Sequence, residues 1–236
     1  MAHAATMARR HRGSGVLARA LVAAIGMVAT ALAAAPIAYM LWPAQTPVSL
    51  DAPALPVTIG NVLFNVPPAA IRFKAQRRTG AQPRVDLTFV WPSLAPPDPA
   101  VKPKPSDTPD VTDRLFVTIA ASDGTLAPMD RIKTIYPRYL DGGPVIGQDG
   151  LSRQSFRDGS AYQGEELILD PAAPDRFLLR CTRQIGATPA MCLYERRIGG
   201  ADLTLRFPRM LLKDWRTTAS AVERLIASFR PAPMGD

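Results

Sequence analysis

The sequence is poor in the side chains that most enzymes use for proton transfer and metal binding. It has two histidines, His3 and His11, and both precede the apolar segment described below. The rest of the chain therefore offers no Ser-His-Asp triad, no Cys-His pair and no histidine-containing metal site. Carboxylate chemistry, as in glycoside hydrolysis, or a Ser-Lys pair is what remains for an enzyme.

Motifs for phosphate and nucleic-acid binding are also missing. The glycine-rich segment 141–150 (DGGPVIGQDG) lacks the spacing of a dinucleotide-binding loop or a P-loop. The formal net charge is +8, but Arg9, Arg10, Arg12 and Arg19 contribute half of it before the apolar segment. The remaining basic residues form no dense stripe with interleaved aromatics. We therefore expect no nucleic-acid binding and no cofactor.

The acidic residues show no arrangement typical of a catalytic pair. Glu165 and Glu166 are adjacent, and adjacent side chains of a strand point to opposite faces of its sheet. These two carboxylates therefore cannot line one cleft, and we interpret them as solvated surface groups. The sequence indicates no catalytic residue.

From Ala20 to Trp42 the chain carries 23 consecutive uncharged residues (ALVAAIGMVATALAAAPIAYMLW). As a helix rising about 1.5 Å per residue, this segment is long enough for the hydrocarbon layer of a membrane, which is about 30 Å thick. Basic residues flank its N-terminal side, whereas the first one downstream is Arg72. We therefore predict a transmembrane signal anchor within the lipid bilayer of a bacterial inner membrane. Residues 1–19 would be cytoplasmic and the C-terminal domain periplasmic.

A cleaved signal peptide of a secreted periplasmic protein is the alternative. Residues 20–32 would form its apolar core, and Ala31-Leu32-Ala33 would supply an A-x-A cleavage site. The apolar run continues to Trp42, however, and a cut after Ala35 would place Pro36 next to the cleavage site. Both observations favour the anchor.

Two proline-rich segments divide the remaining chain. Residues 43–56 (PAQTPVSLDAPALP) predict a stiff, extended stalk. Residues 92–109 (PSLAPPDPAVKPKPSDTP) are incompatible with a helix or an interior strand. They form either an exposed loop within one domain or a linker between two lobes. In both interpretations residues 57–230 are the periplasmic domain and residues 231–236 a tail.

Between these segments the sequence predicts an α+β domain built mainly from antiparallel strands. Residues 84–91 alternate, with Val85, Leu87, Phe89 and Trp91 on one face. Strands are likewise expected at 57–66, 114–121, 151–156, 161–170, 176–183, 190–198 and 201–207.

Two helices complete the predicted domain. Pro128–Tyr136 is expected as a short middle helix that begins with proline and is ended by Pro137. Asp214–Phe229 has the spacing of an amphipathic C-terminal helix, and Asp214 is its expected N-cap. Asp158-Gly159 predicts a hairpin turn.

The C-terminal strands allow a prediction of register. A two-residue turn at Gly199-Gly200 pairs residues 190–198 with 201–207, and placing Cys181 opposite Cys192 adds residues 176–183. One face, interrupted only by Arg196, then collects Phe177, Leu179, Cys181, Cys192, Tyr194, Leu203, Leu205 and Phe207. We expect the C-terminal helix to cover this face, with Trp215 against it.

Cys181 and Cys192 are the most specific chemical signal in the chain. A pair of cysteines in the oxidising periplasm predicts a disulfide. There is no C-x-x-C motif, and two thiolates alone lack the further ligands that zinc requires.

The other face of the predicted meander carries Arg176, Arg180, Arg197 and Arg206. These arginines are a candidate interaction surface for an anionic partner. The alternative is a solvated sheet face on which Arg197 pairs with Asp202 across two strands. We interpret the protein as a non-catalytic binding or envelope-complex accessory module whose partner is another envelope protein. A carboxylate-dependent hydrolase of the cell envelope is the alternative.

Overall fold

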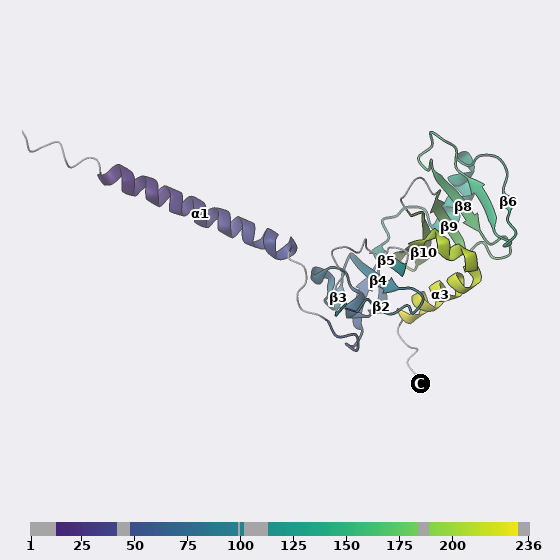
Figure 1. The fold of residues 1–236 in the computed structure, drawn as a ribbon, viewed down its shortest axis with the longest axis horizontal. Coiled ribbons are helices and arrows are strands. Elements are labelled where there is room, and N and C mark those ends of the chain that lie inside the picture. Colours follow the sequence, from purple (N-terminus) through teal and green to yellow (C-terminus); the bar gives the residue numbers. More distant parts are fainter. Residues whose placement is uncertain (1–12, 42–47, 99, 102–112, 184–188, 231–236) are drawn as a thin grey trace, which may run out of the picture. The chain divides into compact units, whose positions relative to one another are not determined.

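The computed structural model describes residues 13–41, 48–98, 100–101, 113–183 and 189–230 (Figure 1). The chain divides into two compact units, Met1–Gln45 and Thr46–Asp236. Several predicted features lie outside the described residues: the basic residues 9–12, Trp42, residues 43–47 of the stalk, residue 99 and residues 102–109 of the second proline-rich segment, and the tail 231–236.

The N-terminal unit contains one helix, α1 (Gly13–Leu41), which begins at Gly13 rather than at Ala20. Its segment Arg19–Pro36 is apolar and long enough to cross a membrane, and none of that segment is buried against protein. A helix that exposes apolar side chains all round is typical of a segment surrounded by lipid. Its length and composition fit the predicted anchor, and they fit a signal sequence equally well.

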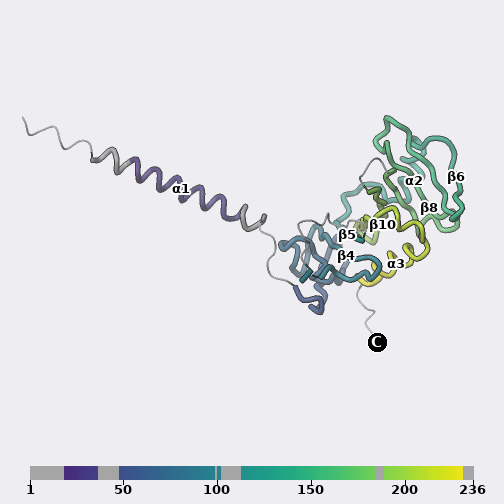
Figure 2. The backbone as a smooth tube through the Cα atoms, in the orientation of Figure 1, coloured from purple at the N-terminus to yellow at the C-terminus, as the bar shows by residue number. Residues whose placement is uncertain are grey.

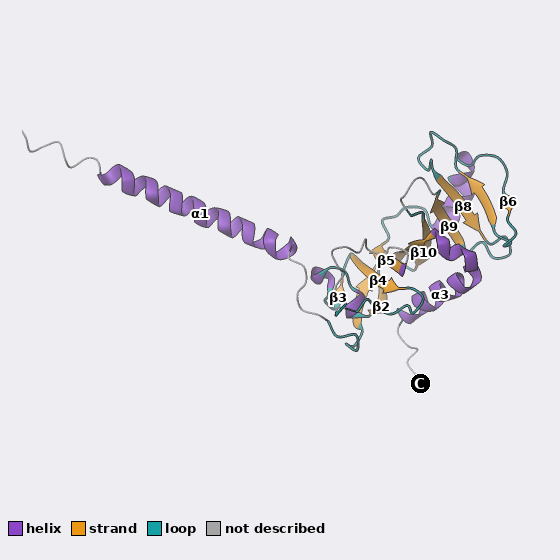
Figure 3. Ribbon diagram, in the orientation of Figure 1, coloured by secondary structure: helices purple, strands orange, loops and turns teal. Residues whose placement is uncertain are grey.

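The second unit is an α+β domain, whose strands and helices are coloured in Figure 3. Its strands form two sheets, and Figure 2 traces the course of the backbone through them. A small sheet has the order β2-β1-β3, and a large eight-stranded sheet has the order β4-β5-β11-β10-β9-β8-β7-β6. Antiparallel pairing predominates, as predicted, and β1 with β3 is the parallel pair among the described strands. The strands are β1 (Leu55–Ile59), β2 (Val62–Val66), β3 (Gly80–Ala81), β4 (Arg84–Val90), β5 (Arg114–Ala121), β6 (Val145–Ile146), β7 (Ser152–Ser155), β8 (Glu165–Leu169), β9 (Leu178–Thr182), β10 (Met191–Ile198) and β11 (Ala201–Pro208).

The helical elements of this unit are short except for the last. The middle helix is α2 (Pro128–Thr134), which ends two residues earlier than predicted and is followed by the 3-10 turn η4 (Tyr136–Arg138). The C-terminal helix is α3 (Trp215–Ser228), and Asp214 caps it by accepting a hydrogen bond from the Thr217 N–H. The other 3-10 turns are η1 (Pro68–Ala70), η2 (Lys74–Gln76) and η5 (Arg209–Asp214).

Two predicted segments differ in detail from the structure. Residues 57–66 are two strands instead of one, because Gly60 and Asn61 adopt positive φ angles and form a hairpin turn. Gly60 also packs against the backbone of Gly200, where a Cβ atom would lie 1.8 Å from the carbonyl oxygen. The hairpin predicted at Asp158-Gly159 is present as β7 and β8, but its connection runs from residue 156 to 164.

The predicted register of the C-terminal strands is confirmed. Ile198 pairs with Ala201 and Cys192 with Phe207. Cys192 lies opposite Cys181. Because side chains alternate along a strand, the large sheet has a core face, which packs against α3, and an opposite outer face. Residues of the core face, the small sheet and α3 form one buried cluster, which includes Phe64, Leu87, Val117, Leu179, Leu205, Val222 and Phe229.

Two arginines of the described strands lie on the core face, Arg153 and Arg196. Arg153 pairs with Asp149, whereas α3 supplies the partner of Arg196. Both carboxylate oxygens of Glu223 accept hydrogen bonds of 2.9 Å from Arg196. Tyr194 donates its hydroxyl to the same carboxylate, and burial raises the pKa of Tyr194 to about 12. Trp215 stacks on Phe177 at the β9 end of this face, with ring centroids 5.3 Å apart. The indole N–H of Trp215 donates to the carbonyl oxygen of Asp149.

Candidate functional site

The outer face of the large sheet has two halves that differ in what lies on them. We call β8, β9 and β10 the covered half, because α2 and η4 pack there. Tyr136 of η4 forms a second buried cluster with Phe156, Leu167 and Leu178. We call β4, β5 and β11 the open half, because a hollow of about 490 Å³ lies there. The hollow is lined by Arg72, Arg84, Asp86, Phe116, Thr118 and Arg206.

Arginines of the covered half have carboxylate partners. Arg180 Nε lies 2.8 Å from Glu165 Oε2, and its side chain is only 19% exposed. The Arg180 guanidinium also lies 5.1 Å from the centre of the Tyr162 ring. Arg131 of α2 reaches across to β10, where its Nη2 lies 2.9 Å from a Glu195 oxygen. Arg131 ties α2 to the sheet, whereas Arg180 joins β9 to β8 and to the connection that precedes β8. Charges paired in this way are less available to a partner.

A buried carboxylate organises the open half. Asp86 is 4% exposed and accepts hydrogen bonds from Arg84 (2.7 and 2.9 Å), Gln76 (3.0 Å) and Thr118 (2.8 Å). Burial alone would raise the pKa of the Asp86 carboxyl, but these hydrogen bonds outweigh it and hold the pKa below its ordinary value. Asp86 therefore stays ionised and fixes the position of Arg84, whose side chain is 56% exposed.

The other two arginines of the hollow have no carboxylate partner within the described residues. Arg72 follows the bridge between Ile71 and Leu87, and its N–H donates to the Asp86 carbonyl at 2.9 Å. The Arg72 guanidinium lies 5.1 Å from the centre of the Phe116 ring. Arg206 projects from β11 and is exposed. Since Asp86 compensates one of the three arginines, the hollow carries two uncompensated positive charges.

The four arginines predicted as one surface are separated in the structure. Arg180 belongs to the covered half and Arg206 to the open half. Arg197 forms the predicted pair with Asp202, with Nε and Oδ1 2.7 Å apart. Arg176 lies in the turn before β9 and lines a different hollow of about 420 Å³ beside α3, together with Trp215. Only Arg206 of the four is therefore part of the open half.

Sequence reasoning missed Arg72, Arg84 and Phe116 as members of the surface. Arg84 and Asp86 alternate with the apolar residues of 84–91, which indicated a polar strand face. That this face adjoins β11 depends on the pairing of β5 with both strands. No local signal in the sequence predicts that pairing.

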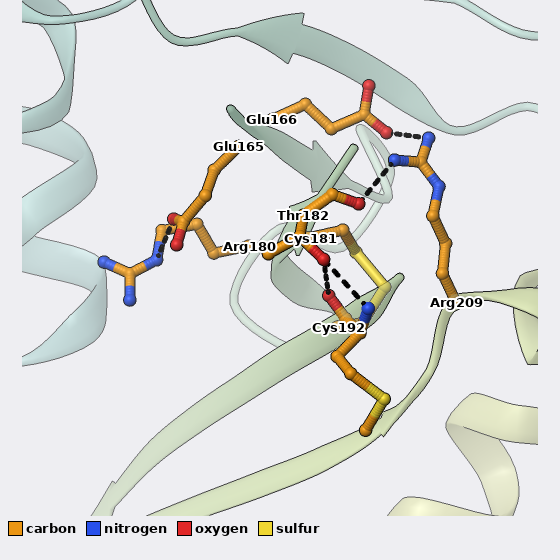
Figure 4. The surroundings of a disulfide bond; sticks show 8 residues. Glu165, Glu166, Arg180, Cys181, Thr182, Cys192 and Arg209 are labelled. Atoms are coloured by element: carbon orange, nitrogen blue, oxygen red, sulfur yellow. Dashed lines mark hydrogen bonds and ion pairs between the residues drawn. A yellow bond between two sulfur atoms is a disulfide. The ribbon is translucent and has the colours of Figure 1, made fainter. Parts of the chain in front are cut away.

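The predicted disulfide is present between β9 and β10 (Figure 4), with the two Sγ atoms 2.06 Å apart. It is buried on the core face. Glu165 and Glu166 point away from each other: Glu165 contacts Arg180, and Glu166 contacts Arg209 on the other side of β8. Each carboxylate is held by its own arginine, so the two do not form a catalytic pair.

A third hollow, of about 220 Å³, contains three carboxylates, and their contacts do not favour hydrolysis. Glu195 and Asp202 form ion pairs with Arg131 and Arg197. Hydrogen bonds from Thr125 hold the pKa of Asp123 below its ordinary value, whereas a general acid in glycoside hydrolysis needs a raised pKa. Within the described residues, no cluster of His, Cys, Asp or Glu is arranged to hold a metal ion.

Comparison with known proteins gives structural likenesses. No family model and no curated protein matches the chain. The fold is similar to that of Smlt3025, an immunity protein of the Stenotrophomonas maltophilia type IV secretion system, with a TM-score of 0.53 and 15% identity over 76% of this chain and 94% of that one. FrpD, an iron-regulated outer membrane lipoprotein of Neisseria meningitidis, aligns with a TM-score of 0.42 and 8% identity over 78% and 95% of the two chains. At 15% identity the likeness to Smlt3025 concerns the fold alone. The TM-score of 0.42 with FrpD is too low to indicate a shared fold.

Proposed function

We propose that residues 46–236 form a non-catalytic binding module on the periplasmic side of a bacterial inner membrane, anchored by α1, and that its open half binds another envelope protein. The observation that carries this proposal is the hollow over β4, β5 and β11 with its two uncompensated arginines. A structural sheet face needs no such charge excess, because unpaired charge weakens the fold by self-repulsion. A surface that binds an anionic partner, in contrast, uses such an excess of positive charge.

Two further observations support the location and the class of function. The apolar α1 and the buried disulfide both fit a domain in an oxidising compartment beyond the membrane. The fold is shared with an immunity protein of a secretion system. We therefore propose that this chain also binds another envelope or secretion-system protein.

The location is tested by a topology assay. A reporter that is active only outside the cytoplasm, fused after Asp236, should be active, and the fusion should fractionate with membranes. A soluble mature form that begins near Ala34 would show that the apolar segment is a cleaved signal.

The binding role is tested by photo-crosslinking in intact cells. A photoreactive residue replaces Thr204, a half-buried position that lines this hollow and also the edge of the third hollow, and whose side chain has no hydrogen bond within the described residues. The matched position is Ser220, which is exposed on α3 beside the other hollow. We expect a discrete crosslinked protein from position 204 and none from position 220. Crosslinking from position 220 alone would move the binding surface to α3.

A further inference from the structure

We infer that the segment of the partner that enters the open half is acidic: a stretch of polypeptide whose carboxylates engage Arg72 and Arg206 across the hollow. This inference rests on the proposed function, because it names the chemistry of the partner at the same surface.

Arg72 is held in a fixed position for such a contact. Its backbone is tied to β4 through the Asp86 carbonyl, and its guanidinium lies near the rings of Phe73 and Phe116, at 5.5 and 5.1 Å from their centres. A guanidinium that is already ordered loses little conformational entropy when it binds. The planar fork of donors matches a carboxylate in two parallel hydrogen bonds. Arg72 is therefore suited to a directed contact with Asp or Glu side chains.

The acidic group already present in the hollow does not compete for these arginines. Asp86 is buried beneath the surface, and its oxygens accept from Arg84, Gln76 and Thr118. Arg206 comes from the neighbouring strand and lines the same hollow. A segment lying across the hollow would contact the strands through two positive groups, so charge complementarity selects a negative ligand.

An apolar contact adjoins the charges. Phe73 is 51% exposed and follows Arg72 directly in the chain. A large aromatic side chain that is half exposed beside an arginine is typical of a protein interface, where the two residue types occur together. The partner segment should therefore combine carboxylates with an apolar residue.

A lipid surface and a nucleic acid fit the same hollow less well. The uncompensated arginines line a concave surface, whereas a bilayer is flat on this scale and binds clusters of protruding basic residues. A nucleic acid requires a basic track along its backbone and exposed rings for stacking. Two uncompensated arginines in a hollow do not provide such a track.

Fluorescence anisotropy on the full chain in neutral-detergent micelles tests the inference, with labelled octaglutamate as the probe. The test variant is Arg72→Gln with Arg206→Gln. The matched control is Arg216→Gln with Arg224→Gln, which removes the same charge from exposed positions of α3 beside the other hollow. Both variants should fold, because all four side chains are exposed. Each variant loses a guanidinium–ring contact, Arg72 with Phe116 or Arg216 with Trp215, so any decrease in melting temperature should be small and similar in the two.

We expect the test variant to bind octaglutamate about tenfold more weakly, since two exposed charge contacts are lost. The control should stay within about twofold, since distant charges are screened at physiological salt. Equal weakening in both variants would overturn the inference, as would octaglutamate binding that the test variant leaves unchanged. So would binding to phosphatidylglycerol vesicles or single-stranded DNA that depends on Arg72 and Arg206 while octaglutamate does not bind.

The same variants separate this inference from the proposed function. Suppose that the crosslink from position 204 persists undiminished in the Arg72→Gln, Arg206→Gln variant. The proposal that the open half binds a protein would then stand, and the inference that the bound segment is acidic would be wrong. Octaglutamate binding at the hollow without any protein crosslinked from position 204 would retain the anion preference and overturn a protein partner.

Discussion

The covered and open halves of the outer sheet face contain the same kinds of side chains in different arrangements. On the covered half, Arg180 has a carboxylate and an aromatic ring as neighbours, and Arg131 has a carboxylate. On the open half, Asp86 is buried and compensates Arg84 alone, so Arg72 and Arg206 have no carboxylate partner in the part of the chain that the structure describes. An arginine that is paired with a carboxylate stabilises the fold, whereas an exposed arginine that lines the hollow without such a pair is available to a partner. The residue type alone does not separate the two roles.

A substitution on the core face should give the largest loss of stability, against which substitutions on the two halves can be compared. Trp215 is 8% exposed, stacks on Phe177 and donates to a carbonyl oxygen. Trp215→Ala should lower the free energy of unfolding by about 3–5 kcal/mol, the usual cost of truncating a buried aromatic. Chemical denaturation followed by circular dichroism measures it. Arg224→Ala, exposed on the same helix, is the control and should stay within about 0.5 kcal/mol. A silent Trp215→Ala would show that α3 contributes little to the core.

The disulfide should stabilise the strands beneath the covered half. It joins residues 11 apart in the sequence, and closing a loop of that size contributes about 3 kcal/mol in the chain-entropy model. Replacing both Cys181 and Cys192 with alanine should lower stability by about that amount. Amide exchange should rise first in β9 and β10 while β4 and β5 remain protected. Equal loosening of all four strands would show that the two halves unfold as one unit.

The Asp86 network should stabilise the open half in a pH-dependent way. The pKa of Asp86 is lower in the folded chain than in the unfolded chain, so its stabilisation is present above the unfolded pKa of about 4. That stabilisation is lost as pH falls through the folded pKa. Asp86→Asn should lower stability by about 1.5–3 kcal/mol at pH 7.

Denaturation of the wild type and Asp86→Asn at several pH values tests this directly. The difference between them should shrink as pH falls from about 5 towards 2, because the wild type then loses the same charge. A difference that is constant across that range would mean that the Asp86 charge contributes nothing and that only packing is lost.

Arg180→Ala and Arg206→Ala give the most direct comparison of the two halves by stability. Arg180→Ala leaves Glu165 without its partner and removes the contact with Tyr162, so we expect a loss of about 1–2 kcal/mol. Arg206→Ala removes an exposed side chain and should stay within about 0.5 kcal/mol. Thermal melts of both variants measure the contrast. Equal losses would contradict the assignment of the two arginines to different roles.

The parts of the fold that were predictable are those with strong local signals. Alternation along 190–198 and 201–207, the Gly199-Gly200 turn and the cysteine pair determined the register, which the structure confirms. The spacing of α3 and its cap at Asp214 were predictable for the same reason. In each case the pairing or packing partner lies close in the sequence or has a pattern with a single apolar face.

The candidate site was less predictable, because it depends on contacts between distant segments. β5 joins β4 to β11, and this pairing places Arg84 and Arg206 on the same sheet face, where both line the hollow. Residues 128–136 indicated a short middle helix, but not that it would cover one half of the outer face. Arg180 was therefore expected on the surface, and the structure places it beneath this cover.

The measurement that tests the account most directly is crosslinking from position 204 in two backgrounds, Arg206→Ala and Arg180→Ala, with the melting temperature of each protein measured in parallel. We predict that Arg206→Ala keeps its stability and loses the crosslinked partner. Arg180→Ala should lose stability and retain the crosslink at temperatures where it is folded. The opposite result, an Arg206→Ala protein that is destabilised but crosslinks as strongly as the wild type, would contradict the account, because Arg206 would then stabilise the fold and would not bind the partner.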